Sequence, residues 1–180
     1  MGGRQINPQD LSTSIIEEWL SSCSQLHGVD CRPEWTEDLR EIRLVDVSTR
    51  KVVKYPDYCC KYVALSYVWG DVAQQSYQLG SLLGNLPQTI EDAISFVQKL
   101  GRQYLWVDWL CIGQKDDADK HHQIERMWGI YRGAYVTVMA LSGESADAGL
   151  PHLGPNKRIY PQVNCCINGR RLVGLIPYRD

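Results

Sequence analysis

The chain has 180 residues and a hydrophobic share of 44%, which suffices for one globular domain with a core of ordinary size. Its formal net charge of -2 does not indicate binding to nucleic acid or to an anionic membrane. No apolar run approaches the roughly 20 residues that span a bilayer, and the N-terminal residues lack the apolar core of a signal peptide. The seven cysteines include no Cys-x-x-Cys pair, so we expect reduced thiols in the cytoplasm and no metal site.

Residues 1–38 are expected to form an N-terminal arm that contains one helix. The helix is predicted over 15–23, because its apolar side chains recur at the spacing of one helical face. These side chains are Ile15, Ile16, Trp19 and Leu20. We expect this face to pack on the core or on a second subunit.

Residues 39–153 alternate between apolar runs and helical patterns, as a single α/β domain would. The domain opens with a predicted β-hairpin, in which strands over 39–47 and 51–55 flank a polar turn. Three short apolar runs then predict buried strands. They are expected at 63–68, 104–108 and 135–141. Because strand–helix–strand connections are right-handed and link parallel strands, we predict a parallel sheet flanked by helices.

Two helices are predicted between these three strands. The first begins near Thr89-Ile-Glu-Asp92, which resembles a capping box, and it ends at Gly101. The second follows the acidic run 115–119, whose charges suit a helix N-terminus without any catalytic role. The second helix should bury a stripe of apolar residues. This stripe is predicted to contain Ile124, Met127, Trp128 and Tyr131.

Residues 154–180 differ in composition from the domain that precedes them. Prolines separate short apolar pieces, and Asn168-Gly169 predicts the turn of a second hairpin. We expect this tail to be the start of a C-terminal extension in a longer protein.

Polar side chains follow each of the three predicted parallel strands. Such strands deliver their following loops to one edge of the sheet, where ligands bind in open α/β folds. This edge should gather Asp71, Asp108 and Glu144. The alternative is that Asp108 ties down a loop while Trp109 and Cys111 are core. If a concavity forms, its predicted lining residues are Trp69, Gly70, Asp71, Asp108, Cys111 and Gln114.

Other catalytic patterns are weak in this sequence. It contains no Walker A loop, no Gly-x-Gly-x-x-Gly and no Gly-x-Ser-x-Gly. A thiol-dependent hydrolase would need Cys111 beside His121 or His122, oriented by Asp108. Adjacent histidines at a helix start are more often solvated, so this class is the least favoured.

Five blocks of the sequence resemble the fungal heterokaryon incompatibility (HET) domain, in the family's order. They are Tyr62–Gly70, Leu86–Ile90, Leu105–Gln114, Gln123–Met127 with Ile130-Tyr131, and Gly149–Pro151. The match covers residues 39–153 and neither end of the chain. It implies a cytoplasmic module of fungal non-self recognition and programmed cell death, which acts through self-association or a protein partner.

The resemblance also implies a distant relation to TIR domains, and therefore a flavodoxin-like sheet. Some TIR domains hydrolyse NAD with a glutamate on the helix after a central strand, and the corresponding helix here carries Glu125. The family pattern commonly places Glu-Lys near the start of this helix, where this chain has Asp119-Lys120. The alternative function is therefore an NAD glycohydrolase, with Glu125, Asp108 and Asp119 as candidate catalytic residues and NAD as substrate rather than cofactor. A carboxylate there would stabilise the positive charge that develops on the sugar as nicotinamide leaves.

Overall fold

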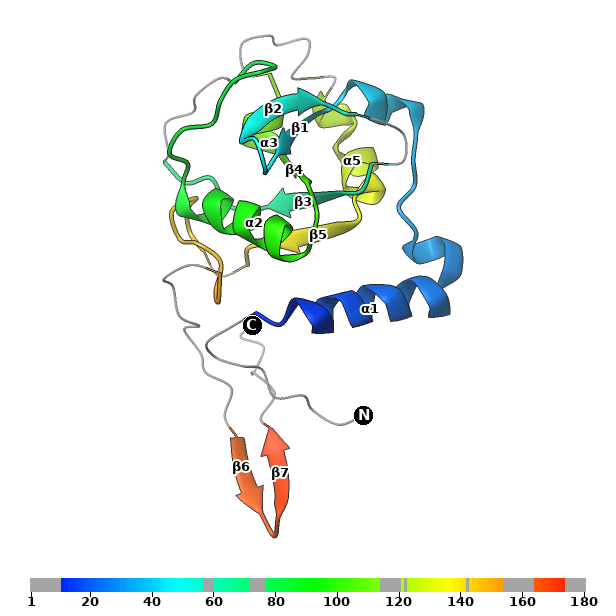
Figure 1. Ribbon diagram of the computed structural model, residues 1–180, viewed down its shortest axis with the longest axis vertical. Coiled ribbons are helices and arrows are strands. Elements are labelled where there is room, and N and C mark those ends of the chain that lie inside the picture. Colours follow the sequence, from blue (N-terminus) through cyan, green and yellow to red (C-terminus); the bar gives the residue numbers. More distant parts are fainter. Residues whose placement is uncertain are drawn as a thin grey trace.

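A five-stranded sheet with helices on both faces forms the centre of the computed structural model (Figure 1). The structure describes residues 11–56, 60–71, 77–113, 121, 123–141, 143–153 and 164–173. The strand order is β2-β1-β4-β3-β5. The strands are β1 Arg43–Asp46, β2 Lys51–Lys54, β3 Tyr62–Ser66, β4 Tyr104–Val107 and β5 Val136–Met139. Strands β4, β3 and β5 are mutually parallel, whereas β1 is antiparallel to both β2 and β4.

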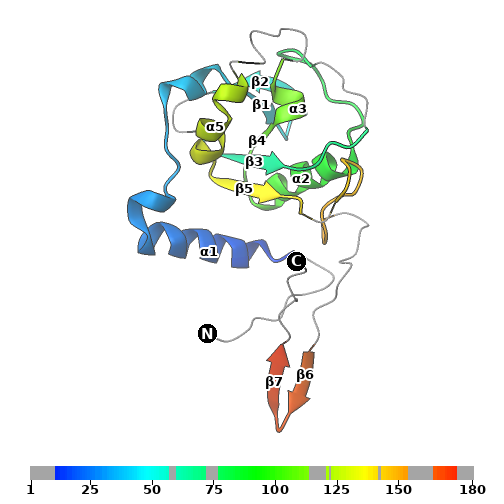
Figure 2. The same cartoon turned by 180° about the vertical axis from the view of Figure 1, so that it is seen from behind.

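The three parallel strands confirm the predicted α/β fold. Their order, β4-β3-β5, corresponds to the 2-1-3 order of flavodoxin-like sheets. The crossovers from β3 to β4 and from β4 to β5 run in opposite directions, so right-handed connections place their helices on opposite faces. Figures 1 and 2 show α2 (Gln88–Lys99) on one face, and α3 (Asp108–Cys111) with α5 (Met127–Gly133) on the other.

The core lies in this sheet and under its helices because β3 and β4 are apolar and buried on both faces. In β3, Tyr62, Val63 and Leu65 are fully buried. Trp106 of β4 is also fully buried and meets the ring of Tyr131 edge to face, with 5.3 Å between centroids. Such burial is typical of a central strand covered on both sides, as the sequence predicted. The prediction of a buried strand over 135–141 is wrong, since β5 lies at the edge of the sheet and is only partly buried, with Met139 62% exposed.

The predicted hairpin forms, and it extends the sheet through β1 on the outer side of β4. The carboxylate of Asp46 fixes its turn, since it accepts hydrogen bonds from the amides of Ser48 at 2.9 Å and Thr49 at 3.1 Å. Gln103, just before β4, donates to the same carboxylate at 3.1 Å. The first strand is shorter than predicted because Glu37–Glu41 form a 3-10 helix, η2, before it.

The predicted capping box of α2 is wrong. The hydroxyl of Thr89 accepts a hydrogen bond from the amide of Gly149 at 3.0 Å, and the carboxylate of Asp92 accepts one from the amide of Leu150 at 2.7 Å. Thr89 and Asp92 are both buried, so these long-range bonds satisfy amides that would otherwise be buried without a partner. They hold the segment 143–153 against α2.

The N-terminal arm contains α1 (Thr13–Leu26), which is longer than predicted, and the 3-10 helix η1 (Gly28–Cys31). Ile16 packs against the core, whereas Trp19 from the same predicted face is 61% exposed. The predicted face is therefore only partly covered by the rest of the chain. Among the described residues, no helix has the length and apolar character needed to cross a membrane.

Deleting residues 1–24 is expected to destabilise the protein by about 1–2 kcal/mol, because the partly buried Leu11 and Ile16 lose their contacts with the core. Thermal unfolding of the two chains measures this difference. Trp19→Ala is the control and should melt like the wild type, since the side chain is mostly exposed. An unchanged melting temperature in the deletion variant, together with loss of a dimer, would instead place this face at a subunit interface.

The tail contains a separate two-stranded sheet of β6 (Asn164–Ile167) and β7 (Arg170–Val173). Asn168 and Gly169 between them have φ values of 51° and 73°, as a two-residue hairpin turn of type I′ requires. The predicted second hairpin is confirmed. Figure 2 shows it apart from the five-stranded sheet.

Candidate functional site

Loops that follow the parallel strands meet at the edge where these strands end. Asp108 is the first residue of α3 and so directly follows β4. The loop after β3 contains Trp69, whose carbonyl accepts a hydrogen bond at 3.2 Å from the amide of Ala146, in the segment that follows β5. All three loops therefore contribute residues to this edge.

The side chains of Trp69 and Asp108 are directly bonded. The indole Nε1 donates to the carboxylate oxygens of Asp108 at 3.1 and 3.0 Å, and the amide of Trp109 donates to Oδ1 at 2.7 Å. Burial raises the pKa of Asp108, and the hydrogen bonds from Trp109 and Trp69 offset only part of this effect. The carboxylate thus ties the loop after β3 to the end of β4.

The charge of Asp108 shifts the pKa of two nearby tyrosines. Burial raises the pKa of Tyr67, and the charge of Asp108 raises it further. The same two causes raise the pKa of Tyr131, whose side chain also forms a hydrogen bond with Ser66. Both phenols therefore stay protonated at neutral pH and can act as hydrogen-bond donors. Sequence reasoning missed both residues, although Tyr67 lies inside the conspicuous block that ends at Gly70.

Cys111 is a core residue rather than part of a concavity. Its side chain is 1% exposed, and the amide of Val107 donates to its sulfur at 3.5 Å. Burial raises the pKa of the Cys111 thiol to about 12. A buried, protonated thiol is a poor nucleophile at neutral pH, so this geometry does not support a thiol-dependent hydrolase.

Gly70 approaches the protein's own chain rather than an open cleft. Its φ is +66°, and a Cβ placed there would lie 2.8 Å from the Cβ of Ser145. Gly70 was predicted to line a concavity, but here it packs against the chain itself. The absent side chain makes room for the segment that follows β5.

The remaining predicted site residues that the structure describes lie at the surface. Asp71, Glu144 and Glu125 are all exposed, as is His121. Four predicted features lie outside the described residues: Gln114, Asp119, the acidic run 115–119 and His122. In the part of the chain that the structure describes, no three metal-ligating side chains converge at this edge.

The helical region that contains α5 buries a different set of residues from the one that the sequence predicted. Ile124 is 48% and Trp128 73% exposed, whereas Gln123 and Ile130 are buried. The predicted buried stripe is therefore wrong for Ile124 and Trp128 but holds for Met127 and Tyr131, which pack against the core. The physical reason is that the buried Ile130 at the centre of α5 sets the inward face of this helix, and Trp128 then points away from it, whereas Ile124 lies before α5 begins.

We call Ile124, Trp128 and Arg132 the exposed stripe. Trp128 and Arg132 are four residues apart in α5 and share one helical face, and Ile124 is an exposed residue of the short helical segment before it. The guanidinium of Arg132 lies 5.8 Å from the ring centroid of Trp128. It is also paired with the carboxylate of Glu34 at 2.8 Å. The stripe thus combines a large apolar ring with a cation held beside it.

The fold and the edge where the parallel strands end define a mixed α/β module. In this module the carboxylate of Asp108 accepts hydrogen bonds from the chain itself. Residues 62–168, more than half of the chain, match the family described as "Heterokaryon incompatibility protein (HET)", and the chain belongs to this family. The resemblance seen in the sequence is thereby confirmed, whereas the relation to TIR domains stays a prediction.

A curated relative is heterokaryon incompatibility protein 6, OR allele, of Neurospora crassa. The two are 30% identical over 131 residues, which cover 59% of this chain and 19% of the relative. The chain therefore spans only a small part of the length of that protein. No solved structure matches the chain.

Proposed function

We propose that this chain is a module of fungal non-self recognition that acts in the cytoplasm by binding protein, either a second copy of itself or another partner, and so triggers programmed cell death. The observation that carries this proposal is the exposed stripe. Trp128 is 73% exposed although it lies on a helix that packs on the core. Tryptophan and arginine contribute most to binding energy at protein interfaces.

The candidate catalytic groups support a binding function better than a catalytic one. The Asp108 carboxylate is bonded to Trp69 and to the amide of Trp109, so its oxygens already have donors. Glu125 is exposed on the same helical turn as Ile124. A carboxylate that stabilises a sugar cation needs a pocket that excludes water.

An NAD glycohydrolase is the second candidate, and the surroundings of Asp108 are what favour it. A carboxyl with a raised pKa beside Tyr67 and Tyr131 is a combination that active sites use. Incubating the purified chain with NAD and measuring free nicotinamide separates the two candidates. Our proposal expects no release above buffer. Release that Asp108→Asn or Glu125→Gln abolishes would favour the hydrolase.

The binding proposal is tested with Trp128→Ala. If copies of the chain associate through the exposed stripe, this variant should weaken the association about tenfold or more, as seen by sedimentation velocity over a dilution series. The matched control is Trp19→Ala, which removes another exposed indole from α1 and should associate like the wild type. Equal weakening by both substitutions would show that the stripe has no specific role.

A further inference from the structure

Three side chains at the end of α1 have the chemistry of metal ligands. The Nδ1 atom of His27 lies 3.4 Å from the sulfur of Cys23 and 3.5 Å from the sulfur of Cys31. All three ligand atoms lie within 4.8 Å of one another, and neither cysteine is in a disulfide. Cys23 is half-buried, whereas His27 and Cys31 are exposed, so an ion can reach the group from solvent.

The backbone brings these residues together without help from an ion. Cys23 and His27 are four residues apart and share one helical face, and the amide of His27 donates to the carbonyl of Cys23 at 3.0 Å. Gly28 then adopts a φ of +58°, which ends the helix and turns the chain. The short helix η1 carries Cys31 back to the same side of His27. The spacing is Cys-x3-His-x3-Cys, which a search for Cys-x-x-Cys does not find.

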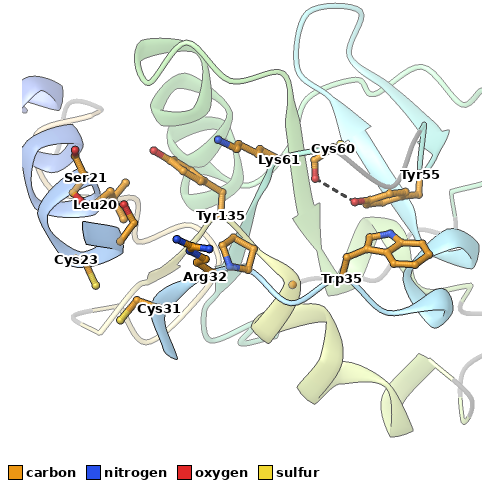
Figure 3. Close-up of a pocket in the computed structure, with 13 residues that line it drawn as sticks. Leu20, Ser21, Cys23, Cys31, Arg32, Trp35, Tyr55, Cys60, Lys61 and Tyr135 are labelled. Atoms are coloured by element: carbon orange, nitrogen blue, oxygen red, sulfur yellow. Dashed lines mark hydrogen bonds between the residues drawn. The ribbon is translucent and has the colours of Figure 1, made fainter. Parts of the chain in front are cut away.

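The group lies beside a pocket on the opposite edge of the sheet from Asp108. This pocket has a volume of about 550 Å³, and its lining includes residues from α1, from η1 and from the segments just before β3 and β5. Cys23 and Cys31 are among them, and Figure 3 shows their two sulfur atoms close together at one end, with Tyr135 and Lys61 farther along. The cysteine pair is therefore separate from the candidate site described above.

We propose that Cys23, His27 and Cys31 bind one Zn²⁺ through Sγ, Nδ1 and Sγ. Tetrahedral zinc has bonds of about 2.3 Å to sulfur and 2.0 Å to nitrogen, which separate the two ligand atoms by about 3.5 Å. The distances of 3.4 and 3.5 Å match this spacing. Thiolate with imidazole selects zinc over magnesium or calcium. Binding releases the two thiol protons to solvent, and water takes the fourth position.

A zinc ion here would join the last turn of α1 to η1. The two elements follow one another directly in the chain, and α1 has no fully buried residue. The ion would thus fix the direction in which the N-terminal arm leaves the domain. Because this role concerns the arm and not the exposed stripe, it can fail or hold independently of the proposed recognition function.

The test uses the full chain, reduced and stripped of metal by a chelator, then titrated with Co²⁺ as a spectroscopic probe. The expected result is one equivalent of cobalt with the d–d bands of a tetrahedral site and a thiolate-to-cobalt band, all removed by added Zn²⁺. Cys23→Ser and His27→Gln should each lower the affinity about 100-fold or more. Circular dichroism verifies that both variants remain folded. The control, Cys165→Ser with Cys166→Ser, removes two exposed thiols elsewhere and should bind like the wild type.

A second readout locates the ion without relying on the variants. Zinc should slow the alkylation of Cys23 and Cys31 by iodoacetamide, as measured by mass spectrometry, and leave that of Cys165 unchanged. A wild-type chain without tetrahedral cobalt bands would overturn the proposal. So would cobalt binding that survives Cys23→Ser but is lost in the Cys165→Ser, Cys166→Ser control.

Discussion

Replacing Asp108 with leucine is expected to destabilise the protein by about 2–3 kcal/mol, whereas Asp108→Asn should change the free energy of unfolding by less than about 1 kcal/mol. Leucine leaves the indole N–H of Trp69 and the amide of Trp109 without the acceptor that both now use. Asparagine keeps one acceptor oxygen in nearly the same place. Urea unfolding of the three proteins measures both differences.

The comparison of the wild type with Asp108→Asn also gives a pH-dependent prediction. Because the folded-state pKa of Asp108 lies above its model value of 3.8, the folded chain binds this proton more tightly than the unfolded chain does. Stability linked to Asp108 therefore falls as pH rises through the window between the two values. The wild type should gain stability relative to Asp108→Asn as pH falls through this window. A constant difference between the two unfolding curves would contradict the raised pKa.

Titrations of other carboxyls cancel in this comparison. Hydrogen bonds from Arg50 lower the pKa of Glu91, so its contribution runs the other way and is lost as pH falls. Since Glu91 is present in both proteins, the difference between them reports on Asp108 alone. Absolute unfolding curves would mix the two opposing effects.

Gly70→Ala is expected to cost about 2–4 kcal/mol of stability. The positive φ disfavours any residue with a Cβ by about 1–2 kcal/mol, and the new Cβ would also lie 2.8 Å from the Cβ of Ser145. Gly80→Ala separates these causes, because Gly80 has a φ of +81° but no atom within 4 Å of the added Cβ. Thermal unfolding should rank Gly70→Ala well below Gly80→Ala. Equal losses would mean that the contact with Ser145 is unimportant.

The parallel strands were predictable because their signal is local and strong. Leu105, Trp106 and Val107 form an apolar run too short for a helix, and burial on both faces leaves no polar residue to interrupt it. Asn168-Gly169 was predictable for a similar reason, since few residue pairs adopt two positive φ values. In both cases the local sequence and the tertiary structure favour the same conformation.

The candidate site was less predictable because its contacts join distant segments. Nothing near Thr89 in sequence indicates that its hydroxyl accepts from Gly149 rather than capping its own helix. The buried face of α5 could not be predicted from the sequence either, because Ile124 and Trp128 look like core residues by hydrophobicity alone. Their exposure is the feature on which the proposed function rests.

Cell death on expression of the chain in a fungal host tests the central claim most directly. Viability would be compared for the wild type, Trp128→Ala, Glu125→Gln and Trp19→Ala at matched protein levels. The binding account predicts that Trp128→Ala loses killing, while Glu125→Gln and Trp19→Ala kill like the wild type. Loss of killing in Glu125→Gln with full killing by Trp128→Ala would contradict it.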